Sequence, residues 1–133
     1  MFMWQANMSV GVMEFDAHHR RIIELINKLS ASLEKDDNPA VVREVLAEVA
    51  NYTLYHFFEE EDLMTKHGYP EYPAHRKEHL DLTAKTFQLM NNAYGDHVVI
   101  GAEVYDFLVS WLKNHILITD KKYTAFFQAR GLC

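Results

Sequence analysis

Five histidines and two carboxylates recur along this chain of 133 residues at spacings that suit metal binding. One histidine stands alone, two clusters pair residues four positions apart, and the last pairs a histidine with an aspartate five positions on. Imidazole and carboxylate ligands together favour iron over magnesium or calcium, which prefer oxygen alone. The seven candidate ligands are His19, His56, Glu60, His75, His79, His115 and Asp120.

Each cluster falls on a segment with the apolar periodicity of an amphipathic helix. Asp16 is the expected N-cap of the first helix. Residues 1–15 are expected to form an arm that packs on the body through Trp4, Val10, Val12 and Phe15. The expected helices are at about 17–35, 39–67, 73–93 and 101–118, with a short C-terminal helix at about 121–129.

Long amphipathic helices joined by short connections predict an all-α fold. We expect an up-down-up-down antiparallel four-helix bundle with an N-terminal arm and a short C-terminal helix. No stretch alternates between polar and apolar residues over a useful length, so a β-rich fold is not expected. The length suits one domain over residues 1–133, and 49% hydrophobic content is enough for a single core.

The candidate ligands also match in height along such a bundle. With position 37 as the tip of the first connection, His19 lies 18 residues before it and His56 lies 19 after it. With position 97 as the tip of the third, His79 and His115 lie 18 residues on either side. At about 1.5 Å of rise per residue, both antiparallel pairs become level. Face and height together predict that the ligands meet in the interior.

Asp120 needs a local irregularity to join them. It follows His115 by five residues, which is about 140° around an ideal α-helix. The two side chains would therefore diverge on an unbroken helix. We expect a break or a wide turn near Thr119.

Coordination counting predicts two ions with one open position. Two six-coordinate ions offer about twelve positions, and five imidazoles, two bridging carboxylates and one bridging oxygen fill all but one. The neighbours in sequence are apolar, and a dry pocket without a proton relay favours holding dioxygen over cleaving it. Tyr52 and Tyr123, one turn from the ligands, are candidates to hydrogen-bond a bridging carboxylate. The expected pocket residues are Phe57, Ile22, Ile23, Trp111, Leu112 and Ile116.

The composition narrows the functions and the cellular compartments that suit this chain. A net charge of −6 speaks against nucleic-acid binding, which usually needs a basic patch. Cys133 is the only cysteine, so we expect no disulfide framework and a reducing compartment, the cytoplasm. The N-terminus lacks the features of a secretory signal, and no apolar run suits a membrane anchor. No particular protein partner is indicated.

The chain resembles the hemerythrin family, in particular its single-domain bacterial members, the bacteriohemerythrins. The resemblance covers nearly the whole chain, and the full set of motifs is highly specific. The motifs are Trp4 with Ser9-Val-Gly-Val12, Asp16-Ala-His-His19, His56-Phe-Phe-Glu-Glu60, His75-Arg-Lys-Glu-His79, and Trp111-Leu-Lys-Asn-His115 through Asp120.

The resemblance implies a role for each ligand. His75, His79 and His115 would bind one iron, and His19 and His56 the other. Glu60 and Asp120 would bridge the two ions (Fe²⁺/Fe³⁺) beside an oxo or hydroxo group. Dioxygen would bind reversibly at the open position, for storage, delivery or sensing, without enzymatic turnover.

The residue beside the first ligand departs from the family. His18 stands where the family usually has glutamine, so two adjacent histidines compete for one role. Helical phase favours His19, because it shares the apolar stripe of its helix. We therefore expect His18 to be exposed and its replacement by alanine to leave the metal centre nearly intact.

The same residues argue for or against other functions of a metal-binding bundle. A di-iron oxidase on a ferritin-like bundle would want Glu-x-x-His pairs, and no glutamate here has a histidine three positions on. A metal-dependent phosphohydrolase would want adjacent His-Asp ligands, which the chain lacks. A regulatory module responding to iron, nitric oxide or redox state stays open, because it would use the same site.

Overall fold

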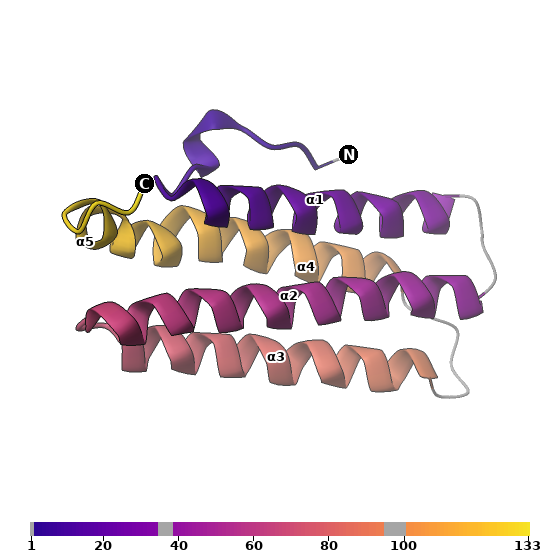
Figure 1. Ribbon diagram of the computed structural model, residues 1–133. Coiled ribbons are helices and arrows are strands. Elements are labelled where there is room, and N and C mark those ends of the chain that lie inside the picture. Colours follow the sequence, from indigo (N-terminus) through magenta and orange to yellow (C-terminus); the bar gives the residue numbers. More distant parts are fainter. Residues whose placement is uncertain (1, 35–38, 95–100) are drawn as a thin grey trace.

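Four long helices build the described part of the molecule, and the expected all-α antiparallel bundle is confirmed (Figure 1). The computed structural model describes residues 2–34, 39–94 and 101–133. Positions 37 and 97, expected at the tips of two connections, lie outside these residues. The long helices are α1 (Met13–Glu34), α2 (Pro39–His67), α3 (Tyr72–Tyr94) and α4 (Gly101–Asn114).

Shorter elements close the two ends of the described chain. A 3-10 turn, η1 (Ala6–Met8), lies in the N-terminal arm. The C-terminal elements are a π-helical turn η2 (His115–Thr119), a 3-10 turn η3 (Asp120–Tyr123) and a short helix α5 (Thr124–Gln128). The expected helix over 101–118 therefore ends as an α-helix at Asn114, because the backbone widens there into the π turn.

The start of α1 corrects the sequence-based expectation. The helix begins at Met13, not near residue 17, so Asp16 lies in its first turn and not at its N-cap. The Asp16 carboxylate instead holds the arm: it accepts hydrogen bonds from Ser9 Oγ at 2.6 Å and from the Val10 amide at 2.8 Å. Gly11, at φ 74°, turns the chain between arm and helix in a conformation that favours glycine.

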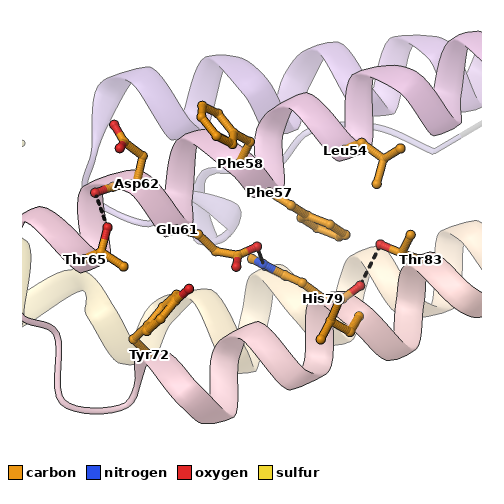
Figure 2. Close-up of a pocket in the computed structure, with 10 residues that line it drawn as sticks. Leu54, Phe57, Phe58, Glu61, Asp62, Thr65, Tyr72, His79 and Thr83 are labelled. Atoms are coloured by element: carbon orange, nitrogen blue, oxygen red, sulfur yellow. Dashed lines mark hydrogen bonds and ion pairs between the residues drawn. The ribbon is translucent and has the colours of Figure 1, made fainter.

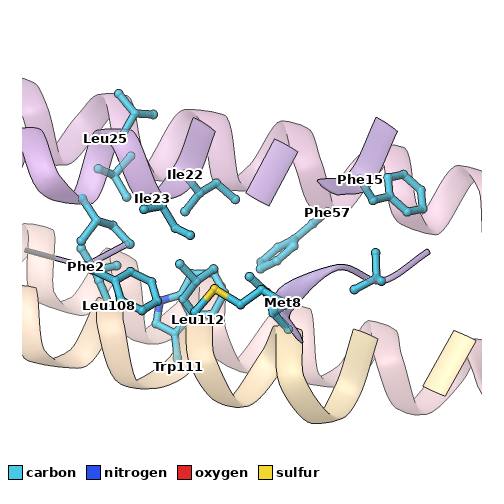
Figure 3. Close-up of a cluster of buried hydrophobic side chains, with 14 of the residues drawn as sticks. Phe2, Met8, Phe15, Ile22, Ile23, Leu25, Phe57, Leu108, Trp111 and Leu112 are labelled. Atoms are coloured by element: carbon cyan, nitrogen blue, oxygen red, sulfur yellow. The ribbon is translucent and has the colours of Figure 1, made fainter. Parts of the chain in front are cut away.

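The core gathers apolar side chains from the arm and the helices (Figure 3). Val10, Val12 and Phe15 are buried as expected, and Trp4 packs against the core while Arg20 lies 4.7 Å over its ring. None of the helices in the described part of the chain is both long and apolar enough to cross a membrane. The side chains labelled in the figure are Phe2, Met8, Phe15, Ile22, Ile23, Leu25, Phe57, Leu108, Trp111 and Leu112.

Replacing Asp16 by alanine should destabilise the fold by about 1–2 kcal/mol, because both hydrogen bonds that hold the arm are lost. Ser9→Ala removes only one of them and should cost less. Urea unfolding of the metal-free protein measures both. Equal stabilities for Asp16→Ala and wild type would show that these bonds do not fix the arm.

Candidate metal centre

All seven candidate ligands meet inside the bundle at one level. Their side chains come from α1, α2, α3 and the segment after α4, and each residue is between 0 and 4% exposed. The Nε2 atoms of His19 and His56 lie 2.9 Å apart, and those of His79 and His115 lie 3.1 Å apart. The heights expected from the sequence thus agree with the positions of these side chains.

The ligand atoms form two groups that share two carboxylates. In each group, the candidate donor atoms lie within 4.8 Å of one another. Only Glu60 and Asp120 belong to both groups, which is the arrangement that two bridging carboxylates require. The larger group is Glu60, His75, His79, His115 and Asp120, and the smaller is His19, His56, Glu60 and Asp120.

Several buried ligand atoms have no hydrogen-bond partner among the described residues. They are Glu60 Oε1, His75 Nε2 and both carboxylate oxygens of Asp120. Asp120 Oδ1 nevertheless lies 2.9 Å from His115 Nε2, and Asp120 Oδ2 lies 3.0 Å from His19 Nε2. Buried polar atoms that crowd together without forming hydrogen bonds are costly unless an ion compensates them. The donor set therefore fits two metal ions.

The π turn explains how Asp120 reaches the site. The Asp120 amide donates to the His115 carbonyl, five residues earlier, so the turn is one residue wider than an α-helical one. That extra width returns Asp120 to the face that carries His115. The irregularity expected near Thr119 is confirmed, and it serves the only candidate ligand pair spaced by five.

Two further carboxylates bind the outer nitrogens of histidines. His79 Nδ1 lies 3.1 Å from Glu61 Oε2, at a groove of about 390 Å³ between α2 and α3 (Figure 2). His115 Nδ1 lies 3.0 Å from Glu78 Oε1, and Thr119 Oγ1 donates to the same carboxylate at 2.7 Å. Such partners orient metal-binding imidazoles. Sequence reasoning missed both, because each contact joins side chains of two different elements.

Of the two candidate tyrosines, Tyr123 forms a hydrogen bond to a carboxylate of the site among the described residues and Tyr52 does not. Tyr123 is buried, and its hydroxyl donates to Glu60 Oε2 at 2.6 Å, as the sequence suggested. For Tyr52 the expectation was wrong. In the described structure it forms no hydrogen bond to Glu60 or Asp120, and its ring instead stands edge-on to His18, 6.1 Å between centroids.

The six expected pocket residues are all buried, and aromatic rings among them touch the ligands. Phe57 stacks on His79 with 3.8 Å between centroids and 9° between planes. Trp111 lies against His115 at 5.9 Å. Ile22, Ile23, Leu112 and Ile116 belong to the same apolar core.

The expectation that His18 is exposed was wrong. This histidine is 6% exposed and not a surface residue, although it belongs to neither ligand group. Its Nδ1 lies 2.9 Å from Nδ1 of His56. The side chain is buried because Phe15, Tyr52 and Tyr55 pack around it.

Burial and neighbouring carboxylates shift the pKa values of the buried histidines in opposite directions. Burial lowers the pKa of His56 to about 4. Burial also lowers the pKa of His75, but the carboxylates of Asp120 and Glu60 outweigh it and raise that pKa to about 9. The pKa of His115 is likewise raised well above its usual value, because the same two carboxylates outweigh its burial. Without metal, two imidazolium rings thus face two carboxylates, and ions would take the place of their protons.

An antiparallel four-helix bundle with two histidine and carboxylate groups, joined by two shared carboxylates, defines a class of protein with a candidate di-metal centre. A family model described as the hemerythrin HHE cation binding domain matches residues 10–127. The chain belongs to the hemerythrin family.

Similar proteins support this assignment. A bacteriohemerythrin of Clostridium acetobutylicum is 31% identical over 128 residues, which covers 92% of this chain and 98% of the relative. One of Stenotrophomonas maltophilia is 36% identical over 125 residues, covering 92% and 79%. A crystal structure of wild-type hemerythrin has a TM-score of 0.88 and 28% identity, covering 94% of this chain and 96% of that one.

Metal binding should release protons. At pH 7, His75 and His115 hold a proton in the metal-free protein, so binding two divalent ions should displace at least about two protons. Calorimetry in two buffers of different ionisation enthalpy measures this number. Affinity should rise as the pH increases from 7 towards 9. A release near zero would contradict the charge state described above.

Removing the Tyr123 hydroxyl should weaken the metal-free fold. Tyr123→Phe deletes a buried hydrogen bond to a charged carboxylate and should lower the free energy of unfolding by about 1.5–3 kcal/mol. Tyr69→Phe is the control, because its hydroxyl bonds Glu71 at 3.2 Å in a partly buried setting. Equal losses for the two variants, measured in urea, would argue against a special role for Tyr123.

Proposed function

We propose that this chain binds dioxygen reversibly at a non-haem di-iron centre, for oxygen storage, delivery or sensing. The unequal size of the two ligand groups carries this proposal. The larger group has five donors and the smaller has four, two of them shared. With one bridging oxygen added, a six-coordinate ion in the larger group is complete, whereas its neighbour keeps one position free. A free position beside His19 and His56 is where a small molecule would bind.

A pair of ferrous ions held by these ligands would supply the two electrons that dioxygen accepts when it binds. The chain supplies the surroundings. Phe57, Ile22 and Ile116 are buried beside the ligands and keep water away from the centre. We infer that these residues, with Ile23, Trp111 and Leu112, surround the bound dioxygen.

Polar neighbours hold the ligand atoms in place. Glu61 and Glu78 accept the outer Nδ1–H of His79 and His115, which leaves both Nε2 atoms directed at the larger group. Tyr123 donates to Glu60 Oε2 and so orients one bridging carboxylate. These contacts hold the charges and protons of the ligand groups in place.

The family and its relatives favour a binding protein over an enzyme. The relatives reported above carry the name bacteriohemerythrin. A regulatory module responding to iron, nitric oxide or redox state would use the same seven ligands. With Cys133 as its single thiol, the chain suits a reducing compartment such as the cytoplasm.

Reversible colour change tests the function. Iron-loaded protein, reduced without air, should develop a visible charge-transfer band when air is admitted and lose it when oxygen is removed. His115→Ala should abolish the band, whereas His67→Ala should keep it, because His67 lies outside both ligand groups. A rapid, irreversible change to the di-ferric spectrum would contradict the carrier and favour a redox sensor.

A further inference from the structure

His18 is a buried polar residue that the proposed metal centre leaves without a role. Its Nδ1 lies 2.9 Å from Nδ1 of His56, whose Nε2 faces the site, 2.9 Å from His19 Nε2. We propose that His18 is a positioning residue, which accepts a hydrogen bond from the outer Nδ1–H of His56 and so keeps Nε2 of that ring directed at the metal. This inference rests on the proposed di-metal centre.

The positions of the protons follow from the contact. An imidazole that binds a metal through Nε2 is neutral and carries its hydrogen on Nδ1. At 2.9 Å, one nitrogen of the pair donates and the other accepts. His56 therefore donates, and His18 accepts through a bare Nδ1 with its own hydrogen on Nε2.

Packing holds the His18 ring in the accepting orientation. Tyr52 stands edge-on to it at 6.1 Å between centroids, with 89° between planes. Phe15 and Tyr55 lie 5.8 Å and 5.4 Å away by the same measure. The exposed Glu14 is the charged neighbour on the same helix, and its carboxylate is 3.9 Å from His18 Nε2, beyond hydrogen-bonding distance.

The partner of His56 also differs in kind from the partners of His79 and His115. His79 and His115 donate to carboxylates, whereas His56 donates to a neutral imidazole. A carboxylate partner makes a metal-binding imidazole more basic, and a neutral partner does so less. The loss of His18 should therefore affect the ion of the smaller group, which contains His56, and spare the ion of the larger group.

Cobalt titration of matched variants tests this role. His18→Gln keeps a side-chain acceptor, His18→Leu removes it, and Glu14→Gln is the control outside hydrogen-bonding distance. Competition with a chelator, followed by the visible Co²⁺ spectrum, gives the two affinities. In contrast to the sequence-based expectation that loss of the His18 ring leaves the metal centre nearly intact, His18→Leu should weaken the binding of one ion by roughly 10–100-fold and leave that of the other within about threefold. His18→Gln and Glu14→Gln should bind both ions about as tightly as wild type.

Zinc-loaded wild-type protein gives a test that needs no variant. ¹⁵N spectra should show a coupling between the two Nδ1 nuclei across the hydrogen bond, with the hydrogen on His56. A hydrogen on Nδ1 of His18 would overturn the proposal, as would unchanged cobalt affinities in His18→Leu. Equal weakening of both ions, in step with a lower melting temperature of the metal-free variant, would reduce His18 to a packing residue. Failure of wild type to bind two ions would overturn the metal centre as well.

Discussion

The rest of this structure depends on how two fully buried carboxylates, Glu60 and Asp120, are neutralised. An uncompensated charge in a protein interior costs several kcal/mol, so such groups persist only with cationic partners or metal ions. Here the partners are five imidazole rings, which the bundle delivers from every long helix or its continuation. Without metal, His75 and His115 neutralise the carboxylates by taking up protons, and they can release those protons to metal ions.

The fold follows from the need to bring these groups to one level. Antiparallel helices hold side chains from distant parts of the sequence at a fixed height, which loops could not do with equal precision. The N-terminal arm covers the core on one side, tied to α1 through Asp16. The π turn after α4 is a local departure from regular helix that the site requires, because it places Asp120 beside His115.

Sequence patterns predicted what depends on helical periodicity. The faces, the heights of His19 and His56, and the break before Asp120 all follow from residues per turn and rise per residue. Contacts that depend on side-chain rotamers across two helices could not be predicted from the sequence. Burial of His18 depends on α2 packing against it, and the Glu78 partner of His115 lies on another helix. The start of α1 was misplaced because an aspartate in a first turn and one at an N-cap look alike in sequence.

We propose that two ions share Glu60 and Asp120 as bridging ligands. Diffraction from iron-loaded crystals at the iron absorption edge would test it directly. The structure predicts two anomalous peaks per chain: one among His75, His79 and His115, the other beside His19 and His56, and both within bonding distance of the two carboxylates. A single peak, or two peaks that do not share Glu60 and Asp120, would contradict the account.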